Sequence, residues 1–376
     1  MHEFIFAGFF RMFTRAVAVL GLVLALAACQ DDTSSRRSLA PIPPATMSLM
    51  ATKGMSKSDP IVIRSYKKEA EMEIWKRGSD GRYALLKTYP ICRWSGQLGP
   101  KVREGDRQAP EGFYTVTPAQ MNPNSAYYLS FDTGYPNAYD RSRGRTGSAL
   151  MVHGTCSSRG CFAMTDQNIA EIYAVAREAF AGGQRNFQFQ SYPFRMTPKN
   201  LAQHRADPNI AFWKNLKEGS DFFEVKHQEP KVAVCGGRYA FNNAGACNGN
   251  FEPDIAQKAA QDDQEVASLV ASGTKAVKLV YDDGGQHPSF RGMFAAETGN
   301  NVSRPEALAS GPQEIVLNEA TTASANSLTT TGSLGSSRTA LKEVPKTQPT
   351  DVAQTPAATA TAVPGYKRVF TSLFGG

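Results

Sequence analysis

The sequence predicts a mixed α+β fold that is mostly β, with a few helices packed on a central sheet. Apolar and polar residues alternate over 72–77, which is the period of a strand with one buried face. The Ser-Asp-Gly tripeptide at 79–81 predicts a hairpin turn into a return strand at 83–91. Apolar residues at helical spacing between 166 and 180 predict an amphipathic helix.

The remaining elements follow from the same rules. The amphipathic helix takes Thr165 or Asp166 as its N-cap and stops at the paired glycines 182–183. Two short helices are expected where a capping residue precedes proline, at Thr-Pro 197–198 and Asp-Pro 207–208. Strands are expected at short apolar or alternating runs bounded by turn residues, at 61–64, 113–116, 149–152, 186–190, 222–226, 231–235 and 276–281.

Composition limits the classes of function. The chain has 376 residues and is 41% hydrophobic, which is enough for one core and a small second domain. A net charge of +7 would suggest nucleic acid as a partner in a cytosolic protein, but the N-terminus indicates export, and we expect no nucleic-acid partner. The sequence contains no Walker loop, His-Glu-x-x-His motif or paired-cysteine zinc spacing, so we expect no cofactor and no metal.

The N-terminus has the pattern of a secretory signal. Arg11 and Arg15 precede an apolar run at 16–28 that is too short for a comfortable membrane span. The Leu-Ala-Ala-Cys sequence ending at Cys29 is similar to a bacterial lipobox, which predicts lipidation of Cys29 and a periplasmic protein anchored to the outer membrane. The alternative is ordinary cleavage after Ala27, which leaves a soluble protein.

One segment carries the chemistry. His153-Gly154 leaves the predicted strand at 149–152, and Ser-x-Gly-Cys follows and ends at Cys161. A histidine at the end of a strand and a cysteine on the next turn can meet in space. An imidazole can then take the thiol proton and keep the sulfur nucleophilic near neutral pH.

These motifs resemble the catalytic domain of the YkuD-type L,D-transpeptidases, and similarity extends over about 60–241. The family has His-Gly followed by Ser-x-Gly-Cys, and its cysteine attacks a carbonyl of the peptidoglycan stem peptide. Shorter supporting matches lie at 72–75, 89–92, 109–114 and 134–140. The resemblance implies a cysteine-dependent enzyme whose partner is the stem peptide, with Cys161 as nucleophile and His153 as general base.

The chain departs from the common family pattern. Arg159 stands where many members have His, Ala163 where many have Arg or Asn, and the connection from His153 to Cys161 is short. These features are closest to the YafK-type branch, which implies hydrolysis of the amide that links an outer-membrane protein to diaminopimelate. The alternatives are a transpeptidase that forms crosslinks or protein attachments, and a non-catalytic wall-binding lipoprotein.

Further roles are assigned around the nucleophile. The N–H groups of Gly160 and Cys161 are candidates for an oxyanion hole. The substrate-binding candidates are Arg159, Ser158, Tyr135 and Tyr139. Packing is an equal alternative for the two tyrosines, and a turn role for Ser158. The group that orients the imidazole is either a backbone carbonyl or Ser158.

The domain division follows from this resemblance and from composition. It comprises a lipoprotein signal peptide at 1–29, a flexible tether at 30–58, a transpeptidase-like domain at 59–241, a C-terminal extension at 242–296, and a low-complexity, disordered tail at 297–376.

Four cysteines remain besides Cys29 and Cys161, namely Cys92, Cys156, Cys235 and Cys247. In an oxidising periplasm they could pair, and the sequence leaves the connectivity open. Cys235 and Cys247 flank a Gly/Asn-rich loop and are the expected disulfide. Cys156 is expected to be a free, partly buried thiol, with a switching disulfide to Cys161 as the alternative.

Overall fold

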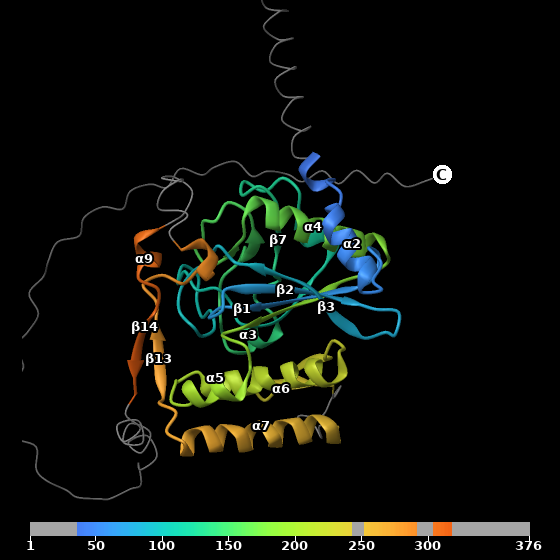
Figure 1. Ribbon diagram of the computed structural model, residues 1–376. Helices are drawn as coiled ribbons and strands as arrows, with labels where there is room; N and C mark the ends of the chain where they lie inside the picture. The colour runs from blue at the N-terminus through green and yellow to red at the C-terminus, as the bar shows by residue number, and fades with distance from the viewer. Residues whose placement is uncertain (1–35, 243–251, 292–303, 318–376) are drawn as a thin grey trace, which may run out of the picture. The chain divides into compact units, whose positions relative to one another are not determined.

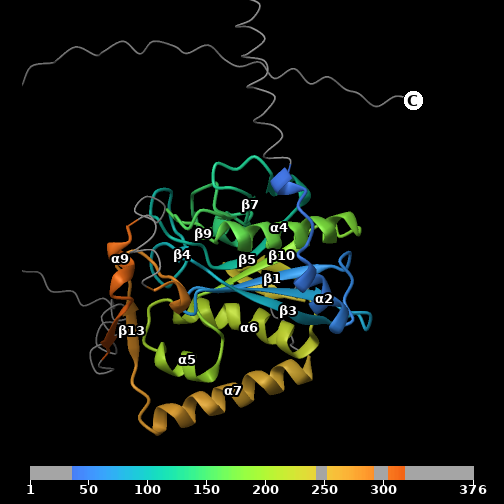
Figure 2. The ribbon, with the colours of Figure 1, turned by 45° about the horizontal axis from the view of Figure 1, so that its top comes forward.

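The computed structural model describes residues 36–242, 252–291 and 304–317. Two five-stranded sheets form within these residues (Figures 1 and 2). The first has the order β3-β2-β1-β10-β5, with β3 at Tyr83–Pro90, β2 at Glu71–Arg77, β1 at Ile61–Tyr66, β10 at Phe187–Tyr192 and β5 at Gly112–Val116. The second has the order β4-β9-β8-β7-β6, with β4 at Arg93–Trp94, β9 at Phe162–Ala163, β8 at Met151–His153, β7 at Ser130–Asp132 and β6 at Met121–Asn122.

Helix α4, Asp166–Ala181, packs its apolar face into the main core. Thr165 caps it by accepting a hydrogen bond from Asn168, as expected for one of the two predicted caps. Ile169, Ile172 and Ala176 recur at helical spacing and are fully buried. The predicted hairpin is also present, since β2 and β3 pair in antiparallel fashion across the expected turn.

Helices α5 and α6 cover the side of the first sheet opposite to α4, and α7 packs on the outer side of α5 and α6 (Figures 1 and 2). Their bounds are Pro198–Gln203, Ile210–Lys226 and Pro253–Ala271. The strand predicted at 222–226 is wrong, because these residues are the last turns of α6 and bury Phe222 and Phe223 on a helical face. Helix α7 contacts both α5 and α6 and belongs to the predicted C-terminal extension.

The beginning of the described chain is folded, which corrects the predicted tether from residue 36 onward. Helix α2, Pro44–Thr52, buries Thr46 and Met50 against the domain. The Thr46 hydroxyl donates to the carboxylate of Glu171 on α4, and Arg177 donates to backbone carbonyls at 38 and 40. The proline and serine content of this segment had predicted a flexible tether. The segment is folded because apolar residues such as Met50 are buried against the domain.

Two two-stranded sheets and four short helical pieces are also described. The sheets are β11 with β12, at Val232–Cys235 and Arg238–Phe241, and β13 with β14, at Val277–Val280 and Gln313–Val316. The helical pieces are α3 at Ala138–Ser142, α9 at Glu306–Ala309, and 3-10 turns at 118–120 and 288–290. Residues 304–317 were assigned to a disordered tail, and the structure contradicts that assignment because β14 pairs with β13.

No helix within the described ranges has the length and apolarity that a membrane crossing requires. The predicted signal at 1–29, including Cys29, lies outside the described residues.

Candidate active site

Two adjacent parallel strands position the His-Gly and Gly-Cys motifs. In the pair of β8 with β9, Val152 lies opposite Phe162 and His153 opposite Ala163. Continuing this register by one residue places Met151 opposite Cys161, which immediately precedes β9. Because side chains alternate along a strand, His153 and Cys161 lie on the same face as diagonal neighbours.

The Cys161 thiol is half-buried and is the free cysteine of the described residues. Its Sγ lies 3.5 Å from the Met151 N–H, which donates to it, and 3.9 Å from the Ala149 carbonyl. Burial raises the pKa of the thiol, and the Met151 N–H opposes that rise. Asp132 raises this pKa further, while Lys101 lowers it. The site therefore holds Cys161 as a protonated thiol at neutral pH.

The His153 imidazole is buried, with 3% of its surface exposed. Its Nδ1 lies 2.6 Å from the Gly154 carbonyl, which can only accept, so Nδ1 carries the proton and Nε2 is the free base. Burial lowers the pKa of His153, partly offset by the bond to Gly154. The ring of Tyr127 lies against the imidazole, with centroids 4.7 Å apart. Of the two predicted orienting groups, a backbone carbonyl occupies the position.

No hydrogen bond joins His153 to Cys161 in the described structure, and neither group contributes to the pKa shift of the other. His153 and Cys161 thus lie on the same face of the second sheet as a neutral imidazole and a neutral thiol. Proton transfer requires the two side chains to approach each other. Catalytic hydrogen bonds are often long without substrate and tighten when it binds.

Ser158 organises the turn that precedes the cysteine. Its Oγ accepts from the N–H groups of Gly160 at 3.3 Å and Cys161 at 3.0 Å, and donates to the Cys161 carbonyl at 2.8 Å. The Ser95 hydroxyl donates to the same Oγ at 2.7 Å. This corrects two predictions. Ser158 is buried in the turn and does not face substrate, and both N–H groups assigned to the oxyanion hole already have a partner.

The turn needs unusual backbone angles. Gly160 has φ of +124°, a region that L side chains rarely adopt, so a glycine is required before the cysteine. Between residues 149 and 161, three residues other than glycine also have positive φ, namely Ala149, Thr155 and Cys156. The chain around the thiol is therefore held in strained conformations, as is common at functional sites.

A disulfide joins this turn to the start of β4. Cys92 and Cys156 are bonded, with Cα atoms 5.4 Å apart. Both expectations for Cys156 are wrong, because this residue is neither free nor available to Cys161. Ala163 packs with the two bonded cysteines and with Phe290. Cys235 is disulfide-bonded, and Cys247, its predicted partner, lies outside the described residues.

The two tyrosines predicted to bind substrate are part of the core. Tyr135 is 5% exposed, and its hydroxyl donates to the carbonyls at 101 and 146. Tyr139 is 4% exposed and stacks on Phe212 and Tyr239. The Tyr135 ring lies near Tyr114 of β5, and the Tyr139 ring lies against Phe212 of α6, so the packing alternative describes both. Arg159, by contrast, is exposed, two residues before Cys161.

Four residues that shape the site belong to no sequence motif. Tyr127, Lys101 and Asp132 lie in loops or short strands. Asp283 comes from the C-terminal extension. Its carboxylate pairs with Arg93 on β4 and with Arg107, the neighbour of Gln108. The backbone of residues 107 and 108 lies so close to Gly160 that a Cβ atom there would be 3.5 Å from the Gln108 carbonyl oxygen. Because Asp283 holds Arg107, the C-terminal extension supports the backbone that packs on the catalytic turn.

Within the described ranges, no group of three or more His, Cys, Asp or Glu residues is arranged to hold a metal ion.

Comparison with known proteins agrees with the geometry. Residues 61–181 match the L,D-transpeptidase catalytic domain family, YkuD. Over 180 residues the chain is 44% identical to the Escherichia coli K12 protein named "Putative L,D-transpeptidase YafK". The matched region covers 48% of this chain and 73% of that protein. The chain belongs to the L,D-transpeptidase family. The same identity and coverage are found with the protein of that name in Escherichia coli O157:H7.

Similar solved structures are more distant. The helical cell shape determining protein Pgp2 from Campylobacter jejuni has 16% identity and a TM-score of 0.30, covering 62% of this chain and 80% of that one. Bd1075 from Bdellovibrio bacteriovorus has 15% identity and a TM-score of 0.28, covering 47% and 78%. L,D-transpeptidases act on peptidoglycan, so family membership gives the chain a cell-wall substrate and a periplasmic or cell-wall location. The predicted mixed, mostly β fold is confirmed.

Proposed function

We propose that this protein is a cysteine acyl-transfer enzyme that cleaves the amide between diaminopimelate of peptidoglycan and an outer-membrane protein. The observation that carries the chemistry is the pairing of a free, half-buried Cys161 thiol with a buried His153 on the same sheet face. The imidazole is anchored through Nδ1, which leaves Nε2 directed to act as a base. These are the two groups that nucleophilic catalysis by a thiol requires.

The reaction proceeds in two halves. His153 Nε2 takes the thiol proton, and Sγ of Cys161 attacks the amide carbonyl at the L-centre of diaminopimelate. The C–N bond breaks, His153 returns the proton to the leaving amine, and a thioester remains on Cys161. Water then attacks the thioester with His153 as base. The C–S bond breaks, the free carboxylic acid leaves, and the thiol is restored.

Hydrolysis is favoured over crosslinking by the residue at position 163. Many family members carry Arg or Asn where this chain has Ala163, and here that side chain packs among Cys92, Cys156 and Phe290. The site thus lacks a polar side chain that other members place two residues after the nucleophile. The alternative is transpeptidation, in which the amine of a second stem peptide resolves the same thioester.

The test uses purified enzyme and peptidoglycan fragments that carry a lysine or protein remnant on diaminopimelate. Mass spectrometry should show loss of the remnant, gain of a free carboxylate and no new dimers. Cys161→Ala should abolish the release and His153→Ala should nearly do so, while circular dichroism stays unchanged. New diaminopimelate–diaminopimelate dimers that depend on Cys161 would identify a transpeptidase instead. Absence of both products, with intact fold, would support a wall-binding protein.

We also propose that Cys29 carries the lipid anchor that the lipobox resemblance implies. Labelling cells with a lipid precursor should mark the wild-type protein, and Cys29→Ser should remove the label. Isolation of wild-type protein that begins at Ala28 would contradict the anchor.

A further inference from the structure

Three side chains of the second sheet form a row across neighbouring strands, and the nucleophile is at one end of it. Asp132 lies opposite Met151 in the pair of β7 with β8, and the register of β8 with β9 places Met151 opposite Cys161. Residues that lie opposite each other in neighbouring strands point to the same face of the sheet. A carboxylate, a thioether and the reactive thiol therefore follow one another on the face that also carries His153.

The contacts of the neighbouring residues agree with this face. Ser130, two residues before the carboxylate on β7, donates through its hydroxyl to Sδ of Met151 at 3.5 Å. The residues that alternate with them, Phe131 and Val152, are fully buried in the main core on the other face. The row is thus directed away from the core, toward the side of the sheet where the reaction takes place.

Asp132 carries a half-buried carboxylate that has no cationic partner in the described structure. Its Oδ1 accepts from the Gly134 N–H at 2.7 Å, and its backbone carbonyl accepts from Gln120 Nε2 at 3.1 Å. Burial raises the pKa of this carboxyl and only the Gly134 N–H opposes the rise, so no basic side chain contributes. Lys101, whose charge does reach the thiol, pairs instead with Asp106 at 2.5 Å.

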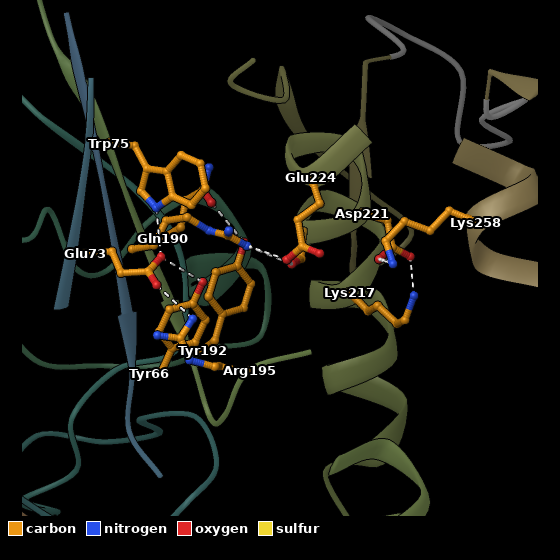
Figure 3. A network of polar contacts seen from close by, with 12 residues as sticks. Tyr66, Glu73, Trp75, Gln190, Tyr192, Arg195, Lys217, Asp221, Glu224 and Lys258 are labelled. Carbon is orange, nitrogen blue, oxygen red and sulfur yellow. Dashed lines mark hydrogen bonds and ion pairs between the residues drawn. The ribbon is translucent and has the colours of Figure 1, made fainter. Parts of the chain in front are cut away.

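Carboxylates elsewhere in the chain are neutralised by the protein itself. Glu73 on the first sheet pairs with Arg195, and Asp221 on α6 pairs with Lys217 (Figure 3). Such pairing is the usual compensation when a charge is taken out of water. Oδ2 of Asp132, by contrast, has no partner among the described residues, and it is not enclosed by the protein. A cation that arrives with the substrate can reach this oxygen.

The row has the order of groups that a diaminopimelate residue presents. Diaminopimelate has two amino groups, and the peptide chain uses the one at the L-centre, which leaves an ammonium at the D-centre. The chain from the L-centre carbonyl to this nitrogen spans about 7 Å when extended. Asp132 and Cys161 lie two strands apart, a separation of about 10 Å. Contacts of about 3 Å at each end bridge the difference, and the methylene groups between them lie over the half-buried Met151.

We propose that Asp132 is a specificity-determining residue that binds the free ammonium of diaminopimelate while Cys161 attacks the carbonyl at the other end. The inference rests on the proposed function for its substrate, but it holds for either fate of the thioester, because both begin with this attack. The ammonium gives the carboxylate the counter-charge that the protein does not provide. An uncharged group at the same point leaves that carboxylate unpaired, so the row selects a basic residue at this position of the stem peptide.

The test measures binding to the full-length Cys161→Ala variant, which cannot turn the ligand over. The probe is a stem peptide with a capped N-terminus and a methylamide on the L-centre carbonyl of diaminopimelate, so that the D-centre amine is its only amine. In calorimetry, a peptide with aminopimelate, which lacks this amine, should bind at least about tenfold more weakly. A lysine peptide keeps the ammonium and lacks the D-centre carboxylate, and it should bind about as tightly as the probe.

Adding Asp132→Asn to the Cys161→Ala variant should remove the preference for the amine. The diaminopimelate peptide should bind at least about tenfold more weakly, and the aminopimelate peptide should bind as before, whereas a purely structural role would weaken both. Asparagine keeps an Oδ1 acceptor for the Gly134 N–H, so the circular dichroism spectrum should be unchanged. Glu104→Gln is the matched control, since Glu104 is an exposed carboxylate in the loop before β5, and it should change neither binding constant.

The inference is overturned if none of the peptides binds, or if the diaminopimelate and aminopimelate peptides bind equally. It is also overturned if the lysine peptide binds as weakly as the aminopimelate peptide, or if the Asp132→Asn protein keeps the preference. Failure of the proposed hydrolysis is a different result. It is seen in the products of the active enzyme, as new dimers in place of release, whereas these binding constants are measured without turnover.

Discussion

The carboxylate of Asp283 lies 3.2 Å from Nη2 of Arg93, across 190 residues of sequence. Both side chains are buried, and Asp283 also pairs with Arg107 and Arg304. The backbone joins the same contact, because Gly285 and Trp94 form a bridge that adds the C-terminal segment to the edge of β4. The extension is thus built into the sheet that carries the catalytic motifs.

Asp283→Asn should destabilise the protein and slow the reaction. The substitution leaves the buried Arg93 guanidinium without its main counter-charge, and breaking a buried pair costs about 3–5 kcal/mol. Urea denaturation followed by circular dichroism measures the loss. Asp282→Asn is the matched control because that neighbour is exposed, and it should stay within about 0.5 kcal/mol of wild type. Equal urea midpoints for the two variants would show that the C-terminal extension does not stabilise the second sheet.

Ser158→Ala should reduce kcat at least about a hundredfold while the fold is kept. The substitution removes the acceptor that aligns two N–H groups and the donor to the Cys161 carbonyl, and small misplacements of a nucleophile cost about that much. Ser157→Ala is the control in the same loop. A fully active Ser158→Ala enzyme would mean that the turn holds its shape through other contacts.

The double variant Cys92→Ser with Cys156→Ser should lower the free energy of unfolding by about 4 kcal/mol. The bond closes a loop with a sequence separation of 64, and the loss of such a constraint on the unfolded chain has about that value. Non-reducing peptide mapping should find the 92–156 crosslink in wild type. Detection of a 156–161 crosslink instead would restore the switching hypothesis.

Stability should fall between about pH 6.5 and pH 4 because of His204. Burial lowers the pKa of this imidazole to about 4, with Lys68 adding to the shift. The unfolded chain therefore takes up the proton first, and stability present above pH 6.5 is lost as pH falls toward 4, by up to about 3 kcal/mol. His204→Phe, which can keep the stacking on Phe194, should show a smaller drop in urea midpoint. An identical drop would assign the effect to other groups.

Alkylation of Cys161 should be slow at neutral pH and should rise steeply in the alkaline range. Burial raises the pKa of this thiol, so the reactive thiolate forms only above the ordinary thiol range. Mass spectrometry of the Cys161 peptide after iodoacetamide treatment measures the rate at each pH, with the urea-unfolded protein as the reference. A plateau of fast labelling below pH 7 would instead show a preformed thiolate–imidazolium pair.

The local parts of the fold were accessible from sequence, because each depends on a pattern within one segment. The apolar face of α4, its Thr165 cap and the hairpin of β2 with β3 are of this kind. The error at 222–226 arose because a short run of Phe and Val has strand propensity, while its burial against β1 and β3 is satisfied as a helix. Propensity is a weak guide once tertiary packing decides.

In the candidate site, too, residues within one sequence motif were predictable, whereas contacts between distant segments were not. His153 and Cys161 were identified from a motif, and the parallel register then places them on one face. Partners remote in sequence were not accessible, since the Cys92–Cys156 bond and the Asp283 contacts depend on which strands become neighbours. Tyr135 and Tyr139 were misassigned because a tyrosine in a long loop has the same local sequence whether it meets substrate or core.

The packing of α2 on the domain would limit the reach of a lipid-anchored enzyme. If Cys29 is lipidated, only the six residues 30–35 separate the anchor from the folded chain that begins at Arg36. Fully extended, they span at most about 20 Å, whereas a free tether through residue 58 would span about 100 Å. The enzyme would work within a thin layer above its own membrane. Bonds that hold a wall close to that membrane would be within range, and deeper layers of the wall would not.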